Sequence, residues 1–212
     1  SVTGYPRNDI ILNSSLYSKH LTFEANIIKT FKTKKVILYA PTFRDGDRYE
    51  RVTPINWDKL NSLLQVNDAT FLIKLHRHDY SMVLKKDYSN IRVLDNESDM
   101  YPIFSRVDLL ITDYSSIFFD FILTEKPVLF FPYDKEKYIT KHRSMYDDYD
   151  SVTPGYKVYN YESFHEKLEL FFENPSNLKN IDINYNYIKE MYNKHVDSDS
   201  ASRTYEFIKS NL

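Results

Sequence analysis

The stretch Leu109-Leu-Ile-Thr-Asp-Tyr-Ser-Ser-Ile-Phe-Phe-Asp120 decides the fold of this chain. The mainly apolar run 107–111 has the length and branching of a strand buried on both faces. Polar residues end it, and Ser115 and Ser116 then open an apolar stretch of helical length. A strand, a tight polar turn and a helix start together aim backbone N–H groups at an anion. The stretch therefore predicts an anion-binding turn; the alternative is that Ser115 only caps the helix.

The rest of the sequence repeats this alternation of short strands and helices. Strands are predicted at 35–40, 70–75, 91–94, 107–111, 127–131 and 156–159. Helices are predicted at 8–31, 57–66, 99–105, 116–124, 161–172, 183–192 and 200–208. Alternating strands and helices are typical of right-handed βαβ units. We expect an α/β fold with a Rossmann-like, mostly parallel sheet flanked by helices.

Composition excludes several classes of function. A length of 212 residues suits one sizeable domain, and a formal net charge of -2 gives no field that attracts nucleic acid or anionic lipid. The chain has no cysteine, which excludes disulfides, thiolate metal sites and a cysteine nucleophile, and suits a reducing compartment. No apolar run reaches the roughly 18 to 20 residues that span a bilayer. Because the sequence starts without Met, we expect a piece of a longer protein.

Residues with chemically useful side chains lie at or just beyond the carboxyl ends of the predicted strands, where doubly wound sheets bind ligands. They are Thr42, Arg44, Lys74, His76, Thr112, Asp113, Ser115 and Ser116. The planar fork of Arg44 suits a phosphate or carboxylate, although loop arginines are commonly solvated. His76 is placed to donate to a phosphoryl oxygen or to transfer a proton near neutral pH; the alternative is a histidine bonded to backbone.

Two further residues extend this candidate site. Asp120 lies one helical turn after Ser116, from where its carboxylate would reach the hydroxyls of a ribose; a surface acid that interacts with the helix dipole is the alternative. Arg143 lies in a polar loop that would let it clamp a phosphate. The spacing of His76, His78 and His142 matches no zinc template, so we expect no metal.

These motifs, in this order, resemble the C-terminal half of the CDP-glycerol glycerophosphotransferases, the teichoic-acid and capsule polymerases and primases of the TagF/TagB type. The matching segments are 4–9, 37–45, 74–76, 110–120, 126–128, 133–134, Arg143 with 146–147, 154–155 and 201–203. The resemblance implies the C-terminal half of a GT-B enzyme. Residues 1–34 would lead in from the missing first GT-B domain, 35–175 would bind the donor nucleotide, and 176–212 would pack back on the GT-B core.

The resemblance also implies an activity. Such enzymes move glycerol phosphate, or ribitol phosphate, from a CDP-polyol to a hydroxyl of a growing polymer or lipid-linked saccharide, and CMP leaves. It implies that the missing first domain carries the general base, so we expect this chain to bind donor weakly and to turn over little. It also implies a cytoplasmic enzyme on the inner face of the cell membrane, without a metal or cofactor.

The residue roles that the resemblance implies are of two kinds. His76, Arg44 and Arg143 would act in catalysis. The donor would be bound by Thr42, Lys74, Thr112, Asp113, Ser115, Ser116 and Asp120.

Two other functions fit the same sequence. A GT-B glycosyltransferase that uses a nucleotide sugar would share the sheet, the diphosphate site and the ribose acid. A non-catalytic docking module of a capsule polymerase would use Tyr185, Tyr187, Lys189 and Tyr192 to contact an acceptor, a membrane or another domain, although ordinary helix packing explains these residues better. Nucleic-acid binding is not expected, since the sequence shows no basic stripe.

Overall fold

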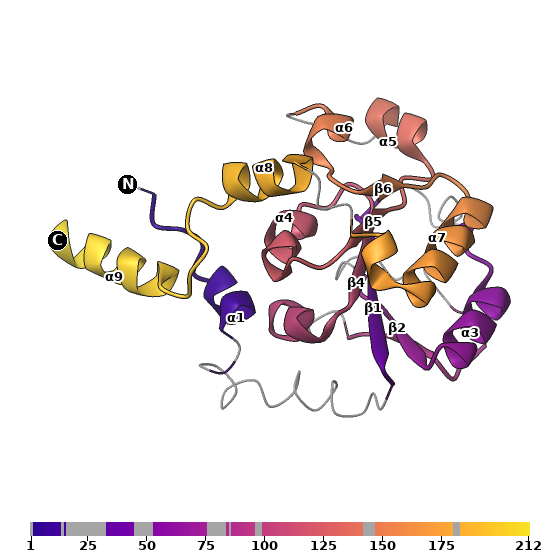
Figure 1. Cartoon of the computed structure of the whole chain (residues 1–212). Helices are drawn as coiled ribbons and strands as arrows, with labels where there is room; N and C mark the ends of the chain where they lie inside the picture. The colour runs from indigo at the N-terminus through magenta and orange to yellow at the C-terminus, as the bar shows by residue number, and fades with distance from the viewer. Residues whose placement is uncertain are drawn as a thin grey trace.

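Six parallel strands form a single sheet at the centre of the structure (Figure 1). The computed structural model describes residues 2–13, 15, 33–44, 53–75, 84, 86–95, 99–141, 147–179 and 183–212. The strands are β1 (Lys35–Ala40), β2 (Ala69–Ile73), β3 (Ile91–Val93), β4 (Leu109–Thr112), β5 (Val128–Phe130) and β6 (Tyr156–Lys157). Their order is β3-β2-β1-β4-β5-β6, so the direction of winding reverses between β1 and β4. The predicted Rossmann-like sheet is confirmed.

Helices cover both faces of the sheet (Figure 1). One face carries α3 (Trp57–Val66) and α7 (Tyr161–Glu173). The other carries α1 (Asn8–Leu12), the 3₁₀ helix η3 (Tyr101–Arg106), α4 (Ile117–Phe121) with its 3₁₀ extension η4 (Ile122–Thr124), and α8 (Ile183–Tyr192). The remaining helices are α5 (Lys135–Lys141), α6 (Tyr149–Val152), the 3₁₀ helix η5 (Pro175–Asn177) and α9 (Ser200–Ser210).

The alternating side chains of the strands divide the core into two clusters. In β1, Ile37 and Tyr39 pack with α3 and α7, whereas Leu38 and Ala40 pack on the opposite face. All four are buried. Side chains of successive strand residues point to opposite faces, so a strand that is buried on both sides reads as a continuous apolar run. This is why the strands were visible in the sequence.

Apolar spacing and capping explain the two long helices of the first face. Leu60 and Leu64 of α3 are four residues apart and fully buried, and Phe164, Leu168 and Phe171 repeat this spacing in α7. An asparagine side chain caps each helix by accepting a first-turn N–H, Asn56 from Lys59 and Asn160 from Ser163. Both helices form where the sequence predicts them.

Some elements differ from the prediction. The expected helix at 99–105 is the 3₁₀ helix η3, which has a proline in its first turn. At its C-terminal end the Lys126 ammonium donates to Ser105 O and Val107 O. Strand β2 ends at Ile73, although the Lys74 N–H still donates to Tyr39 O at 2.9 Å. The short helices α5 and α6 were not predicted. Of the expected helix at 8–31, α1 is present, and residues 14 and 16–32 lie outside the described residues.

Polar contacts join the two ends of the chain on one side of the sheet, where α1 and α9 lie side by side (Figure 1). The Asp9 carboxylate is fully buried and accepts the N–H groups of Ser200 and Ala201 at 3.0 and 2.9 Å. Arg203 donates to Thr3 O at 3.0 Å. Because the first N–H groups of a helix have no partner within it, Asp9 caps α9 from a distant part of the sequence.

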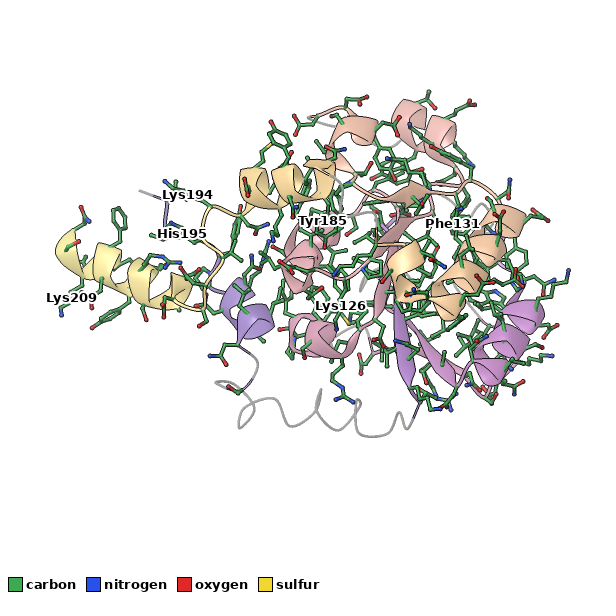
Figure 2. All side chains as sticks on the ribbon, in the orientation of Figure 1. Lys126, Phe131, Tyr185, Lys194, His195 and Lys209 are labelled. Atoms are coloured by element: carbon green, nitrogen blue, oxygen red, sulfur yellow. The ribbon has the colours of Figure 1, made fainter. Side chains whose placement is uncertain are left out.

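Helix α8 packs on the body of the domain (Figure 2). The Tyr185 hydroxyl donates to Ile122 O and Lys126 O, both at 3.1 Å, and Lys189 pairs with Glu125 at 2.8 Å. Tyr187 is exposed. These contacts give α8 an ordinary packing role. In the part of the chain that the structure describes, no helix is long and apolar enough to cross a membrane.

Replacing Asp9 with alanine should loosen α9 without disturbing the sheet. The substitution removes both acceptors for the first N–H groups of α9, and loss of a cap costs about 1 kcal/mol. Hydrogen exchange should therefore speed up at the α9 amides while the β1 amides keep their protection. Ser202→Ala, an exposed change in the same turn, should alter exchange little. Unchanged exchange in α9 of the Asp9→Ala chain would contradict the capping role.

Candidate functional site

The candidate site lies where the sheet reverses, at the carboxyl ends of β1 and β4. Ala40 and Thr112, the last residues of these strands, are paired in register. The chain then leaves β1 toward α3 on one face and β4 toward α4 on the other. In doubly wound sheets this divergence opens a crevice that holds the ligand.

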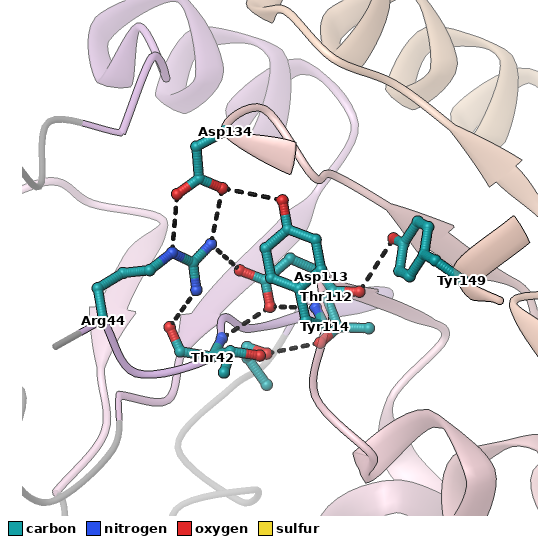
Figure 3. Close-up of polar contacts among 8 residues, drawn as sticks. Thr42, Arg44, Thr112, Asp113, Tyr114, Asp134 and Tyr149 are labelled. Carbon is teal, nitrogen blue, oxygen red and sulfur yellow. Dashed lines mark hydrogen bonds and ion pairs between the residues drawn. The ribbon is translucent and has the colours of Figure 1, made fainter. Parts of the chain in front are cut away.

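The buried carboxylate of Asp113 joins the two diverging loops (Figure 3). Its Oδ1 accepts the backbone N–H groups of Thr42 at 2.7 Å and of Tyr114 at 2.6 Å. Its backbone carbonyl accepts the hydroxyl of Tyr149 at 3.0 Å. Asp113 therefore sets the distance between the loop after β1 and the turn after β4.

Arg44 binds both neighbouring carboxylates (Figure 3). Its Nε and Nη2 donate to the two oxygens of Asp134 at 2.8 and 3.0 Å, and Nη2 also donates to Asp113 Oδ2 at 2.6 Å. Nη1 donates to Thr42 O at 2.6 Å. The Arg44 side chain is only 9% exposed. Its guanidinium is thus already bound by acceptors of the protein.

Aromatic rings complete this cluster. The guanidinium carbon of Arg44 lies 4.9 Å from the centre of the Tyr114 ring and 4.8 Å from that of Tyr138, and the two rings stack at 3.9 Å. The Tyr114 hydroxyl donates to Asp134 at 3.0 Å. Burial and the Asp134 carboxylate raise the pKa of Tyr114 well above its ordinary value, so its hydroxyl stays protonated and keeps donating.

Opposite charges keep Arg44 ionised. Burial favours the neutral guanidine, but the carboxylates of Asp113 and Asp134 outweigh it and raise the pKa of Arg44 above its usual value. One positive charge thus lies between two negative ones. Removing either carboxylate from such a buried group is costly, because it leaves a buried charge less well compensated.

The turn that follows Asp113 offers backbone donors. Among the described residues, the N–H groups of Ser115 and Ser116 have no hydrogen-bond acceptor. Ser116 is exposed and its side chain makes no cap bond, and the Ser115 hydroxyl accepts the Ile117 N–H only at a long 3.4 Å. Capping by Ser115 is therefore weak, and this turn has backbone donors of the kind that bind anions at helix starts.

Two predicted donor-binding threonines lie at the strand ends. Thr112 is fully buried, and its hydroxyl donates to Ala40 O at 2.7 Å, which joins β4 to β1. The hydroxyl oxygen of Thr42 is also buried, and it has no hydrogen-bond partner among the described residues.

Two other predicted residues are engaged away from the Arg44 cluster. The Lys74 ammonium donates to Asp95 O at 2.7 Å, between the ends of β2 and β3. Asp120 is 3% exposed; it accepts the Tyr101 hydroxyl at 2.6 Å and pairs with Arg7 at 3.0 Å. In the described structure Asp120 shares no bond with the Arg44 cluster, so its role toward a ribose stays a prediction.

His76 and Arg143 lie outside the described residues, and their roles stay predictions. Within the described part of the chain, no group of three or more His, Cys, Asp or Glu side chains is arranged to hold a metal ion.

Sequence reasoning did not select several residues of the cluster as site residues, namely Tyr114, Asp134, Tyr138 and Tyr149. Asp134 follows β5 at its carboxyl end, as Arg44 follows β1 and Asp113 follows β4. This shared position at the strand ends was the signal that could have identified it. Tyr114 carried the same signal, since it lies between Asp113 and Ser115, whereas Tyr138 and Tyr149 did not stand out in a chain with 19 tyrosines.

Comparison with known proteins identifies the family of the chain. The family model of CDP-Glycerol:Poly(glycerophosphate) glycerophosphotransferase matches residues 1–210. The chain belongs to this family. It is 34% identical over 183 residues to the teichoic acid glycerol-phosphate primase of Bacillus subtilis (strain 168), which covers 84% of this chain and 44% of the relative. It is 30% identical over 173 residues to the teichoic acid ribitol-phosphate polymerase TarL of Staphylococcus aureus (strain NCTC 8325), which covers 79% of this chain and 30% of the relative.

Solved structures show the same relationship. The wall teichoic acid polymerase TagF superposes with a TM-score of 0.73 at 27% identity over 98% of this chain and 52% of that one. The UDP-GlcNAc 2-epimerase from Neisseria meningitidis superposes with a TM-score of 0.50 at 16% identity over 95% of this chain and 52% of that one, a likeness of fold alone. The chain thus spans about half of these structures, and less than half of the two curated relatives.

Two tyrosine-to-phenylalanine substitutions should separate site geometry from general stability. The hydroxyls of Tyr149 and Tyr185 are both in buried residues and both donate to backbone carbonyls. Each loss should lower the free energy of unfolding by about 1 kcal/mol in urea titrations. Only Tyr149→Phe frees the carbonyl of Asp113, so only this variant should speed hydrogen exchange at the Thr42 and Tyr114 amides. Equal exchange at these amides in the two variants would show that the Tyr149 hydroxyl does not help to hold Asp113 in place.

Proposed function

We propose that this chain is the donor-binding part of a polyol-phosphate transferase. It would hold a CDP-polyol, CDP-glycerol or CDP-ribitol, while the polyol phosphate passes to a hydroxyl of a growing teichoic-acid-like or capsular polymer and CMP leaves. Relatives named for glycerol-phosphate and for ribitol-phosphate transfer support this class of donor. The observation that carries the proposal is the pair of unpartnered N–H groups at Ser115 and Ser116, at the switch point of the sheet.

The chemistry of the donor fits this turn. A CDP-polyol carries a diphosphate, and exposed amides at a helix start supply partial positive charge without a mobile side chain. The hydroxyl of the exposed Ser116 adds a further donor. Phosphoryl transfer depends mainly on positioning and on neutralising the charge that builds on the phosphate and the leaving group. Backbone amides in this turn would position the diphosphate and would neutralise the charge that builds on the departing CMP.

Other protein groups would complete the neutralisation. We propose that His76 and Arg143 approach the diphosphate, as the resemblance implies, and that residues 35–175 make up the donor-binding domain. We also propose that no metal or cofactor takes part, so donor binding should persist in excess EDTA. The acceptor, a polymer or a lipid-linked saccharide, would be presented by another GT-B domain at the cytoplasmic face of the membrane.

Acidic substitutions at the turn test the donor site. Ser115→Glu and Ser116→Glu place a carboxylate against the amides, where it competes with the diphosphate and repels it. We expect each to weaken CDP-glycerol binding by about tenfold or more, the size of one charge-assisted hydrogen bond. NMR titration of the backbone amides measures this even when binding is weak. Ser202→Glu adds the same charge in the first turn of α9, away from the sheet, and should leave the affinity unchanged.

The same titration separates the competing functions. Tighter binding of UDP-GlcNAc than of CDP-glycerol would favour a nucleotide-sugar glycosyltransferase. Unchanged CDP-glycerol affinity in both folded glutamate variants would refute the turn as the donor site. If the folded chain binds neither nucleotide, the donor-binding role itself fails.

A further inference from the structure

We propose that Arg44 is a positioning residue: with Asp134 and Asp113 it locks the carboxyl ends of β1, β4 and β5 so that the Ser115–Ser116 turn is already formed before the donor arrives. The inference deepens the proposed function and rests on it for the identity of the ligand. It replaces the expectation that Arg44 itself neutralises the donor phosphates.

Four of the five N–H donors of Arg44 are already in use. Asp134 accepts two of its N–H groups in a bidentate pair, Asp113 accepts from Nη2, and Thr42 O accepts from Nη1. The rings of Tyr114 and Tyr138 lie within 5 Å of the guanidinium carbon. A phosphate could bind Arg44 in a bidentate manner only by displacing at least one of these partners, and a bidentate arginine–carboxylate pair is among the strongest polar contacts in proteins.

The charge of the cluster also argues against direct capture. One guanidinium is enclosed by two carboxylates, so the cluster as a whole is negative. A negative cluster repels a diphosphate and cannot raise donor affinity by attraction. Any contribution of Arg44 to donor binding must therefore come from the geometry that it imposes.

The bonds of the cluster lead directly to the turn. Asp134 lies four residues beyond the end of β5 and holds both Arg44 and the hydroxyl of Tyr114. Asp113 holds Arg44 and the N–H groups of Thr42 and Tyr114. Ser115 is the next residue of the chain. The two residues before the turn, Asp113 and Tyr114, are thus held by residues of the loops that follow β1 and β5.

Substitution of Asp134 gives results of opposite sign under the two roles of Arg44. Asp134→Asn removes a negative charge beside the site and weakens the hold on Arg44. If Arg44 contacted the phosphates, this variant would bind CDP-glycerol more tightly. As a positioning residue, Arg44 needs Asp134, and the affinity should fall by about three- to tenfold. Arg44→Lys keeps the positive charge but loses the planar guanidinium, so it should lower the affinity for CDP-glycerol by a similar factor.

The measurement is an NMR titration of the full chain at a temperature where circular dichroism shows every variant folded. Glu206→Gln removes one negative charge from the exposed surface of α9 and serves as the charge control, with unchanged affinity expected. Hydrogen exchange of the Ser115 and Ser116 amides, recorded without ligand, should speed up in Asp134→Asn and Arg44→Lys and not in Glu206→Gln.

The outcomes separate this inference from the proposed function. A rise in donor affinity in Asp134→Asn, or unchanged exchange at the turn in both cluster variants, overturns the positioning role. If the wild-type chain binds no CDP-glycerol, the proposed function fails, and the exchange result alone then decides whether Arg44 locks the turn.

Discussion

The structure of the site depends on the hydrogen bonds between the Asp113 carboxylate and the N–H groups that follow β1 and β4. At the point where a doubly wound sheet reverses, the two chains leave toward opposite faces, so their backbone groups can no longer pair with each other. A carboxylate can accept N–H groups from both segments at once, whereas a backbone carbonyl of a strand is already hydrogen-bonded within the sheet. Asp113 therefore holds together two loops that the topology separates.

The buried charges and the backbone amides of the site have different roles. A buried ion pair gains little net stability, since desolvation offsets attraction, but it is costly to break. It is thus better suited to fixing a geometry than to strengthening the fold. The pairing of Arg44 with Asp113 and Asp134 fixes the loops. The amides of Ser115 and Ser116, which carry only partial charge, have no acceptor among the residues that the structure describes.

Sequence reasoning predicted the sheet well because β1, β2, β4 and β5 are mainly apolar runs buried on both faces, a pattern that needs no knowledge of the partners. It also predicted that Thr42, Arg44 and Asp113 would lie together, since parallel strands bring their carboxyl ends to one edge. It could not predict which charges Arg44 meets, because a charged side chain in a loop has many possible partners. The cap that Asp9 provides to α9 was hidden for the same reason, since its partners lie 191 and 192 residues away.

Helix α4 shows that the turn before it depends on contacts from the whole domain. A helix of 5 residues is far too short to be stable in isolation, because nucleation costs more than its few hydrogen bonds return. Tertiary contacts must therefore hold it. Asp120 is held by Tyr101 and Arg7, and Asn193 donates to Phe119 O at 2.8 Å. Asp113 holds the turn before α4 through the N–H group of Tyr114. Contacts with distant residues, at the turn and at the helix, therefore set the direction of the first amides of α4.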